Sequence, residues 1–308
     1  MFRKSFAVAA FVALCSPAFG APAPALVDSA WIEANSCKTG VAVVDIRASK
    51  PAFRVSRIPC SVHAPFREGW RVTANGVPGM LPTAVDLEKL IGGLGIDNKT
   101  QVVVVSAGET SVDLSSAARV YWTFKAMGHD AVSLLNGGFA GFPAGKLQKG
   151  KPGDPRPAAT FKAHPRPEMV ATAADVEGAA GAGILLVDNR ATDLYLGINQ
   201  VASVARRGTI PGAGNLPRNW LVDRAGMLHT PEDLKAIFAV AGISTGSPMI
   251  TFDNTGTMGA LGWFAAHELL GNGNVRLYDG SMAEWAKDPS RPVEDRAKLP
   301  GAELGAGE

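Results

Sequence analysis

The residues best suited to chemistry lie in one polar stretch of the 308-residue chain, Asp253-Asn254-Thr255-Gly256-Thr257-Met258. An apolar run at 249–252 predicts a buried strand before it, and the apolar spacing of 259–270 predicts a helix after it. A tight loop between a strand and a helix directs several backbone N–H groups, at the positive end of the helix dipole, toward one point. We therefore expect an anion-binding loop with the carboxylate of Asp253 at its entry.

The elements that would position this loop occur twice along the chain. In each half, an apolar run ending in Asp-x-Arg is followed by a turn, a helix, an apolar run, a second helix and a third apolar run. Short apolar strands that alternate with helices predict an α/β protein with two domains, each a parallel sheet flanked by helices on both faces. The Asp-x-Arg pairs, Asp45 with Arg47 and Asp188 with Arg190, predict structural ion pairs.

The first twenty residues have the pattern of a secretory signal. Arg3 and Lys4 precede an apolar core at 6–14, and Ala18-Phe19-Gly20 is a cleavage site before Ala21. We expect export, most simply to a bacterial periplasm. The expected division is a signal peptide at 1–20, a first domain at 21–145, an extended linker at 146–168 and a second domain at 169–308.

Charge and cysteine content limit the partners and the redox chemistry. Without Arg3 and Lys4, the Lys and Arg residues equal the 28 Asp and Glu residues in number, which gives no electrostatic case for nucleic acid or a membrane surface. We expect a monomer without a metal or other cofactor. Cys37 and Cys60 remain after cleavage, and in an oxidising compartment they predict a disulfide, with free reactive thiols as the alternative.

The ordered set of motifs resembles the tandem rhodanese family, the thiosulfate and 3-mercaptopyruvate sulfurtransferases. The residues that carry the resemblance are the two Asp-x-Arg pairs, Gly208-Thr209-Ile210-Pro211-Gly212-Ala213, the weaker Arg57-Ile58-Pro59-Cys60-Ser61, Leu135-Asn136-Gly137-Gly138-Phe139, and Tyr278-Asp279-Gly280-Ser281 with Glu284-Trp285. The resemblance implies two rhodanese domains, the first inactive and the second bearing a catalytic Cys. That thiolate, stabilised by the loop amides, would take a sulfane sulfur and pass it to a thiol or cyanide.

The resemblance also shows where this sequence departs from the family pattern. The catalytic Cys position falls on Asp253, which cannot form a persulfide, while Gly256 keeps the family Gly. Asn254 and Thr255 supply no cation, and Leu194 stands at the position of a substrate-binding Arg. The equivalent loop of the first domain, 106–111, has no Cys, and we expect Ser106 and Ser111 to cap the following helix. We therefore expect a catalytically inactive binding or partner module of sulfur or redox metabolism.

Three uses of these residues remain open. Asp253 could be structural, satisfying the loop amides in place of a thiolate. Cys60 or Cys37 could instead act as the nucleophile of an active sulfurtransferase, although neither lies in a strand-to-helix loop. The segment 253–257 also resembles the D-K-T-G-T loop of haloacid-dehalogenase-like phosphotransferases, but Asn254 replaces the Lys and no second acidic motif for Mg²⁺ is visible. A small anion or sulfur compound and a periplasmic protein are the expected partners.

Overall fold

The computed structural model describes residues 23–299, which form two similar α/β domains. Each domain contains a five-stranded parallel sheet, with strand order β1-β8-β7-β2-β4 in the first and β10-β14-β13-β11-β12 in the second. The first sheet comprises Leu26–Val27 (β1), Val41–Asp45 (β2), Val62–His63 (β4), Gln101–Val105 (β7) and Val132–Leu135 (β8). The second comprises Val170–Ala171 (β10), Leu185–Asp188 (β11), Gly214–Asn215 (β12), Met249–Phe252 (β13) and Val275–Tyr278 (β14). The predicted fold class is confirmed.

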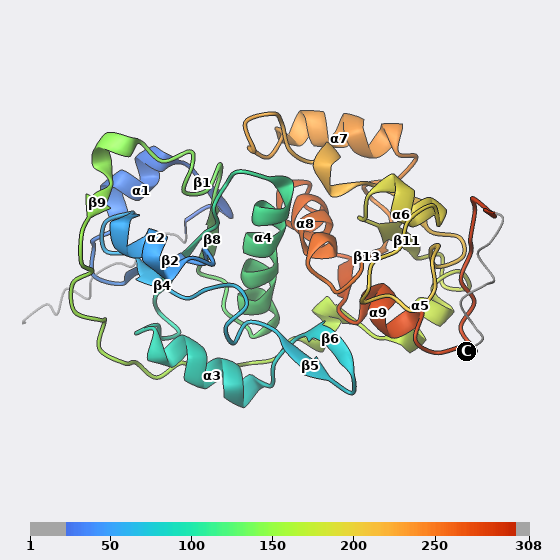
Figure 1. The fold of residues 1–308 in the computed structure, drawn as a ribbon, viewed down its shortest axis with the longest axis horizontal. Coiled ribbons are helices and arrows are strands. Elements are labelled where there is room, and N and C mark those ends of the chain that lie inside the picture. The colour runs from blue at the N-terminus through green and yellow to red at the C-terminus, as the bar shows by residue number, and fades with distance from the viewer. Residues whose placement is uncertain (1–22, 300–308) are drawn as a thin grey trace, which may run out of the picture.

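Helices cover the faces of both sheets (Figure 1). In the first domain they are Ser29–Asn35 (α1), Lys50–Val55 (α2), Ala84–Gly93 (α3) and Ser111–Ala126 (α4). In the second they are Ala173–Gly178 (α5), Thr192–Leu196 (α6), Pro231–Val240 (α7), Met258–Phe264 (α8) and Ser281–Trp285 (α9). Two small antiparallel pairs complete the strands: Ser56–Arg57 (β3) with Gln148–Lys149 (β9), and Val72–Ala74 (β5) with Val77–Met80 (β6).

Threonine residues cap the start of several helices. Thr83 and Thr230 accept hydrogen bonds from the backbone N–H groups of Asp86 and Asp233, as N-caps do. The prediction for the first-domain loop was wrong, because neither Ser106 nor Ser111 caps α4. Thr110 does so, in a reciprocal capping box with Asp113, which leaves the buried hydroxyl of Ser106 without a hydrogen-bond partner.

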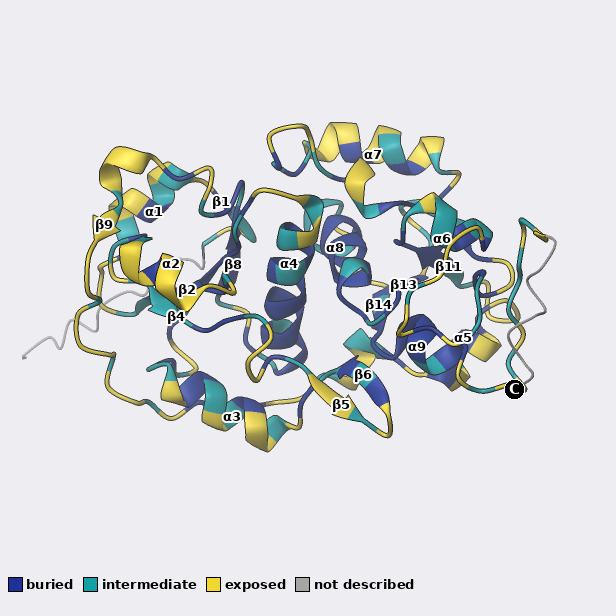
Figure 2. Cartoon of the chain, viewed as in Figure 1, coloured by how far each residue is buried: buried dark blue, intermediate teal, exposed yellow. Residues whose placement is uncertain are grey.

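The two domains share one apolar interface. Helices α4 and α8 lie side by side between the two sheets and are buried along most of their length (Figure 2). The ring of Tyr121 on α4 meets the ring of Phe264 on α8 edge-on, with centroids 4.8 Å apart. A single hydrophobic cluster runs from the first domain into the second, and it fixes how the two halves present their loops to each other.

The segment between the domains runs back along the first domain (Figure 1). Residues 150–166 contain no helix or strand. Arg156 donates from Nη1 to the carbonyl of Val41 at 2.6 Å, and the buried ring of Phe161 packs edge-on against Phe124. These contacts anchor the predicted linker to the first domain.

The helix that follows the Asp253 loop changes type along its length. The helix predicted at 259–270 is α8 followed by one π-helical turn, Ala265–Leu269. Among residues 23–299, no helix is long and apolar enough to cross a membrane. The proposed signal peptide lies outside the described residues.

Candidate functional site

Asp253 lies at the carboxyl end of β13 and is completely buried, at 0% exposure. The backbone N–H of Met258, at the start of α8, donates to its Oδ2 at 3.0 Å. The chain turns back through Gly256, whose φ of +75° and closeness to Arg119 suit only glycine. The loop therefore meets its own carboxylate through one amide, that of Met258.

Ser281 holds the other side of the loop. Its Oγ accepts the N–H groups of Asp253 and Gly256, each at 3.1 Å. Its single proton lies between the carbonyl of Tyr278, at 2.8 Å, and Oδ1 of Asp253, at 3.3 Å, and the shorter contact favours the carbonyl. The loop amides therefore do not all surround the acid as predicted: one binds it and two bind Ser281.

Two arginines that the sequence analysis did not associate with this loop lie beside it. Arg71 donates from Nη2 to Oγ1 of Thr255 at 3.0 Å, and Arg218 contacts the sulfur of Met258 from Nη1 at 3.2 Å. Burial lowers the pKa of both guanidinium groups, and the negative charge of Asp253 partly opposes that shift. The loop itself supplies no cation, as expected, and these two come from segments far from it in sequence.

A third arginine joins the two domains at the loop. Arg119 on α4 is fully buried, donates from Nη1 to the carbonyl of Gly256 at 2.9 Å and pairs with Asp279 at 2.5 Å. The other oxygen of Asp279 accepts the backbone N–H of Leu81 at 2.7 Å. The first domain thus holds the loop that follows Asp253 in the second domain through a buried network of charged groups.

A cavity of about 760 Å³ opens next to this loop, between the domains. Thr255, Thr257 and Met258 form one side, and the first domain supplies the rest, including Arg71 and Ser106. Its apolar wall consists of Ile46, Pro65, Phe66, Val112 and Phe139. Asp253 does not line the cavity. Its charged lining residues are three arginines and three carboxylates: Arg47, Arg67, Arg71, Glu68, Glu109 and Asp113.

Several polar groups around the loop have no hydrogen-bond partner among the described residues. Oδ1 of Asn254, Oγ1 of Thr257 and Oγ of Ser106 are buried and unpaired. The amides of Asn254, Thr255 and Thr257 also donate to no other residue of 23–299. Buried polar groups normally have partners, so this concentration is typical of a binding site.

Both predicted ion pairs are present. Arg47 and Asp45 are 2.7 Å apart, and Arg190 and Asp188 are 2.6 Å apart. Each arginine also donates to a backbone carbonyl further along the chain, Arg47 to that of Ser56 in β3 and Arg190 to that of Gly208. Leu194 lies in α6, half-buried, and brings no charge to the site.

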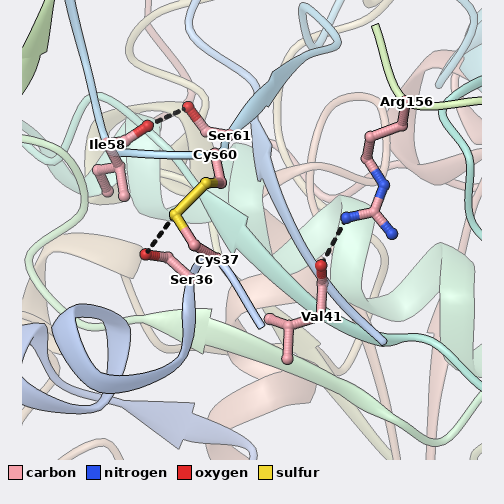
Figure 3. The surroundings of a disulfide bond; sticks show 7 residues. All are labelled: Ser36, Cys37, Val41, Ile58, Cys60, Ser61 and Arg156. Atoms are coloured by element: carbon pink, nitrogen blue, oxygen red, sulfur yellow. Dashed lines mark hydrogen bonds between the residues drawn. A yellow bond between two sulfur atoms is a disulfide. The ribbon is translucent and has the colours of Figure 1, made fainter. Parts of the chain in front are cut away.

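The predicted Cys37–Cys60 disulfide is present, with the two Cα atoms 5.2 Å apart (Figure 3). Cys60 adopts φ of +60°, a conformation that suits glycine better. Among residues 23–299, no group of three or more His, Cys, Asp or Glu side chains could hold a metal ion.

The sequence model of the Rhodanese-like domain matches residues 28–144 and again 172–288. The chain belongs to the rhodanese family. Each match spans one of the two α/β domains, so this is a tandem rhodanese protein, as the resemblance predicted.

The relatives of this rhodanese are sulfurtransferases. The thiosulfate sulfurtransferase of Mus musculus is 33% identical over 278 residues, which cover 85% of this chain and 91% of the relative. The 3-mercaptopyruvate sulfurtransferase of Homo sapiens is 32% identical over 209 residues, covering 67% and 69%. The crystal structure of the 3-mercaptopyruvate sulfotransferase SseA from Escherichia coli superposes with a TM-score of 0.69 at 27% identity, covering 84% of this chain and 99% of that one.

Proposed function

We propose that this rhodanese is an exported, catalytically inactive member of its family that binds a small anion or sulfur compound between its domains. Asp253 would stand where the active relatives carry their nucleophilic cysteine. A carboxylate oxygen can neither accept a sulfane sulfur nor hold it as a persulfide, so the covalent step of sulfur transfer would be absent. The protein would act as a binding or partner module beside other proteins of sulfur or redox metabolism.

The observation that carries this proposal is the environment of Asp253. The carboxylate is fully buried, binds the N–H of Met258 and lies near the charges of Arg71 and Arg218. A group held in this way stabilises the loop, and Asp253 is not among the residues that line the cavity. The two cysteines of the described chain are joined in a disulfide at the edge of the first domain.

The cavity supports the binding part of the proposal. Arg71 supplies a cation, and the amides of Thr255 and Thr257 and the unpaired hydroxyl of Thr257 supply donors for an anion. The volume of about 760 Å³ falls within the range of small-molecule sites. The apolar wall gives room for the body of an organic anion.

The test is a thiosulfate:cyanide assay on the chain from Ala21, with thiocyanate as the readout. We expect no turnover above the buffer rate for the native sequence. We expect Asp253→Cys to form thiocyanate, because Arg71 and Arg218 already supply positive charge beside the new thiolate. Native turnover that survives Asp253→Ala but is lost in Cys60→Ser would overturn the proposal in favour of a sulfurtransferase that uses Cys60.

Export is tested separately. When the full-length chain is expressed in a bacterium with a periplasm, we expect the soluble periplasmic fraction to hold a protein whose N-terminal sequence begins at Ala21. A protein that keeps Met1 and stays with the cytoplasmic fraction would contradict the export part of the proposal alone.

A further inference from the structure

A second cavity, of about 600 Å³, shares no lining residue with the cavity beside the Asp253 loop. Cys37 and Cys60 both line it, and Cys37 lies just before β2, where that strand of the first sheet begins. The proposed binding function makes no use of this cavity or of the disulfide on its wall. The disulfide therefore needs its own explanation.

The first observation is exposure. Both Cys37 and Cys60 are exposed residues, whereas a disulfide that only holds a core together is commonly shielded from solvent. Exchange begins when a thiolate attacks a disulfide sulfur, so an accessible bond beside a cavity can react without unfolding of the protein. Exposed disulfides are accordingly the labile or regulatory ones.

The second observation is charge. Lys38 follows Cys37 directly, and Arg57, His63 and Arg156 line the same cavity. Asp154 is the one acidic residue among the lining residues, so the cavity carries a net positive charge. A positive field attracts an incoming thiolate and stabilises the thiolate that leaves.

The third observation distinguishes the two sulfurs. The hydroxyl of Ser36 lies 4.0 Å from Sγ of Cys37, at the outer limit for a hydrogen bond to sulfur, as the dashed line in Figure 3 shows. A hydrogen bond to sulfur stabilises the thiolate form, which makes Cys37 the better leaving group. Attack is therefore expected at Sγ of Cys60.

The backbone conformation of Cys60 favours reduction of the disulfide. Its φ of +60° lies in the left-handed region, which a residue with a side chain rarely adopts. The bridge to Cys37 helps to hold the residue in that conformation. Opening the bridge frees the turn to relax, which stabilises the reduced form.

From these observations we propose that Cys37–Cys60 is a redox-active disulfide that exchanges with a protein dithiol of the thioredoxin type. A thiolate of the dithiol attacks Sγ of Cys60 and forms a mixed disulfide, while Cys37 leaves as a thiolate and takes a proton from solvent. The second thiol of the partner then loses its proton and attacks the mixed disulfide. Cys60 is released as a thiolate and the partner becomes a disulfide, so two electrons pass from the dithiol to this protein.

The test is the rate at which the folded, oxidised chain from Ala21 is reduced. The chain is mixed with a reduced thioredoxin-type protein, quenched with an alkylating reagent and analysed by intact mass. We expect the folded chain to be reduced within about tenfold of the rate of the urea-unfolded chain. A disulfide that is reached only through unfolding would react slower by about 1,000-fold or more, and that result would overturn the proposal.

A trapping experiment tests the direction of attack. The partner is a thioredoxin-type protein that lacks its second cysteine, so the mixed disulfide persists and can be mapped by peptide mass analysis. We expect the partner on Cys60, and a partner found on Cys37 would contradict the assigned roles. Reduced glutathione is the second arm, and reduction by glutathione but not by the dithiol protein would overturn the choice of partner.

Matched charge variants test the role of the cavity. Lys38→Glu reverses the charge next to Cys37 and should slow reduction by about threefold or more. Lys235→Glu makes the same change on the exposed face of α7 and should leave the rate unchanged. If Lys38→Glu, Lys235→Glu and the native chain are reduced at equal rates, the positive charge of the cavity does not promote exchange. That result combined with slow reduction of the native chain would overturn the proposal.

Discussion

At the scale of single residues, Ser281 decides the shape of the loop around Asp253. Its hydroxyl accepts two backbone N–H groups that no other described residue satisfies, and it does so from the first position of α9 with φ of +50°. A conformation of that kind in a residue with a side chain persists only where surrounding contacts enforce it. Asp253, by contrast, depends on one amide and on the nearby arginine charges.

The change Ser281→Ala tests this role. It leaves the N–H groups of Asp253 and Gly256 buried without an acceptor, so we expect a loss of about 1–3 kcal/mol in the free energy of unfolding. Urea unfolding followed by tryptophan fluorescence measures the loss. Ser203→Ala, at an exposed position, is the matched control and should stay within about 0.5 kcal/mol of the native chain.

At this scale the sequence predicts the residues that a local motif marks and misses those that reach the loop from distant segments. Asp253, the Asp-x-Arg pairs and the disulfide were found because each depends on a local motif or on cysteine pairing. Arg71, Arg119 and Arg218 were missed because they reach the loop from a hairpin, a helix and a turn distant in sequence. No local signal separates such arginines from ordinary surface ones, so only the packing of the two domains reveals them.

At the scale of elements, α4 of the first domain acts on the loop of the second. Arg119 binds the carbonyl of Gly256 and pairs with Asp279, and the segment after β6 binds the same carboxylate through Leu81. The repeat could be predicted from sequence because each strand and helix carries its own period. The contact between α4 and α8 could not, because apolar residues on those helices fit the face of a sheet equally well.

A double-mutant cycle tests this connection. Arg119→Met leaves the carboxylate of Asp279 buried without its partner and should cost about 3–5 kcal/mol of unfolding free energy. Arg119→Met combined with Asp279→Asn removes that uncompensated charge and keeps an acceptor for Leu81. We expect the double variant to recover about 1–3 kcal/mol relative to the single variant, measured by urea unfolding.

Simple additivity of the two changes would contradict the buried pair as the link between the domains. Arg224→Met, at an exposed position in the turn before α7, serves as the control and should leave the unfolding free energy nearly unchanged.

At the scale of the whole molecule, a cavity lies between the two rhodanese domains, and the disulfide lies apart from it. The bridge closes a loop with a sequence separation of 23, between the segment before β2 and the turn before β4. Such a bridge stabilises chiefly by restricting the unfolded chain. The site between the domains depends on both halves, whereas the disulfide belongs to the first domain alone.

Two variants separate the bridge from the turn in which it lies. Cys37→Ala with Cys60→Ala should lose about 3 kcal/mol of unfolding free energy, because the loop is no longer closed. Cys37→Ala with Cys60→Gly should be the more stable of the two by about 1 kcal/mol, since glycine adopts φ of +60° without a penalty. Equal stability of the two variants would contradict a strained turn at Cys60.

The central claim is that no residue of this rhodanese accepts a sulfane sulfur to form a persulfide. It is tested most directly by the intact mass of the folded chain from Ala21 after incubation with thiosulfate and removal of the excess. The account predicts an unchanged mass for the native sequence and a gain of one sulfur atom for Asp253→Cys treated in parallel. A native chain that gains one sulfur atom would contradict the account, and peptide mapping would then identify the residue that carries it.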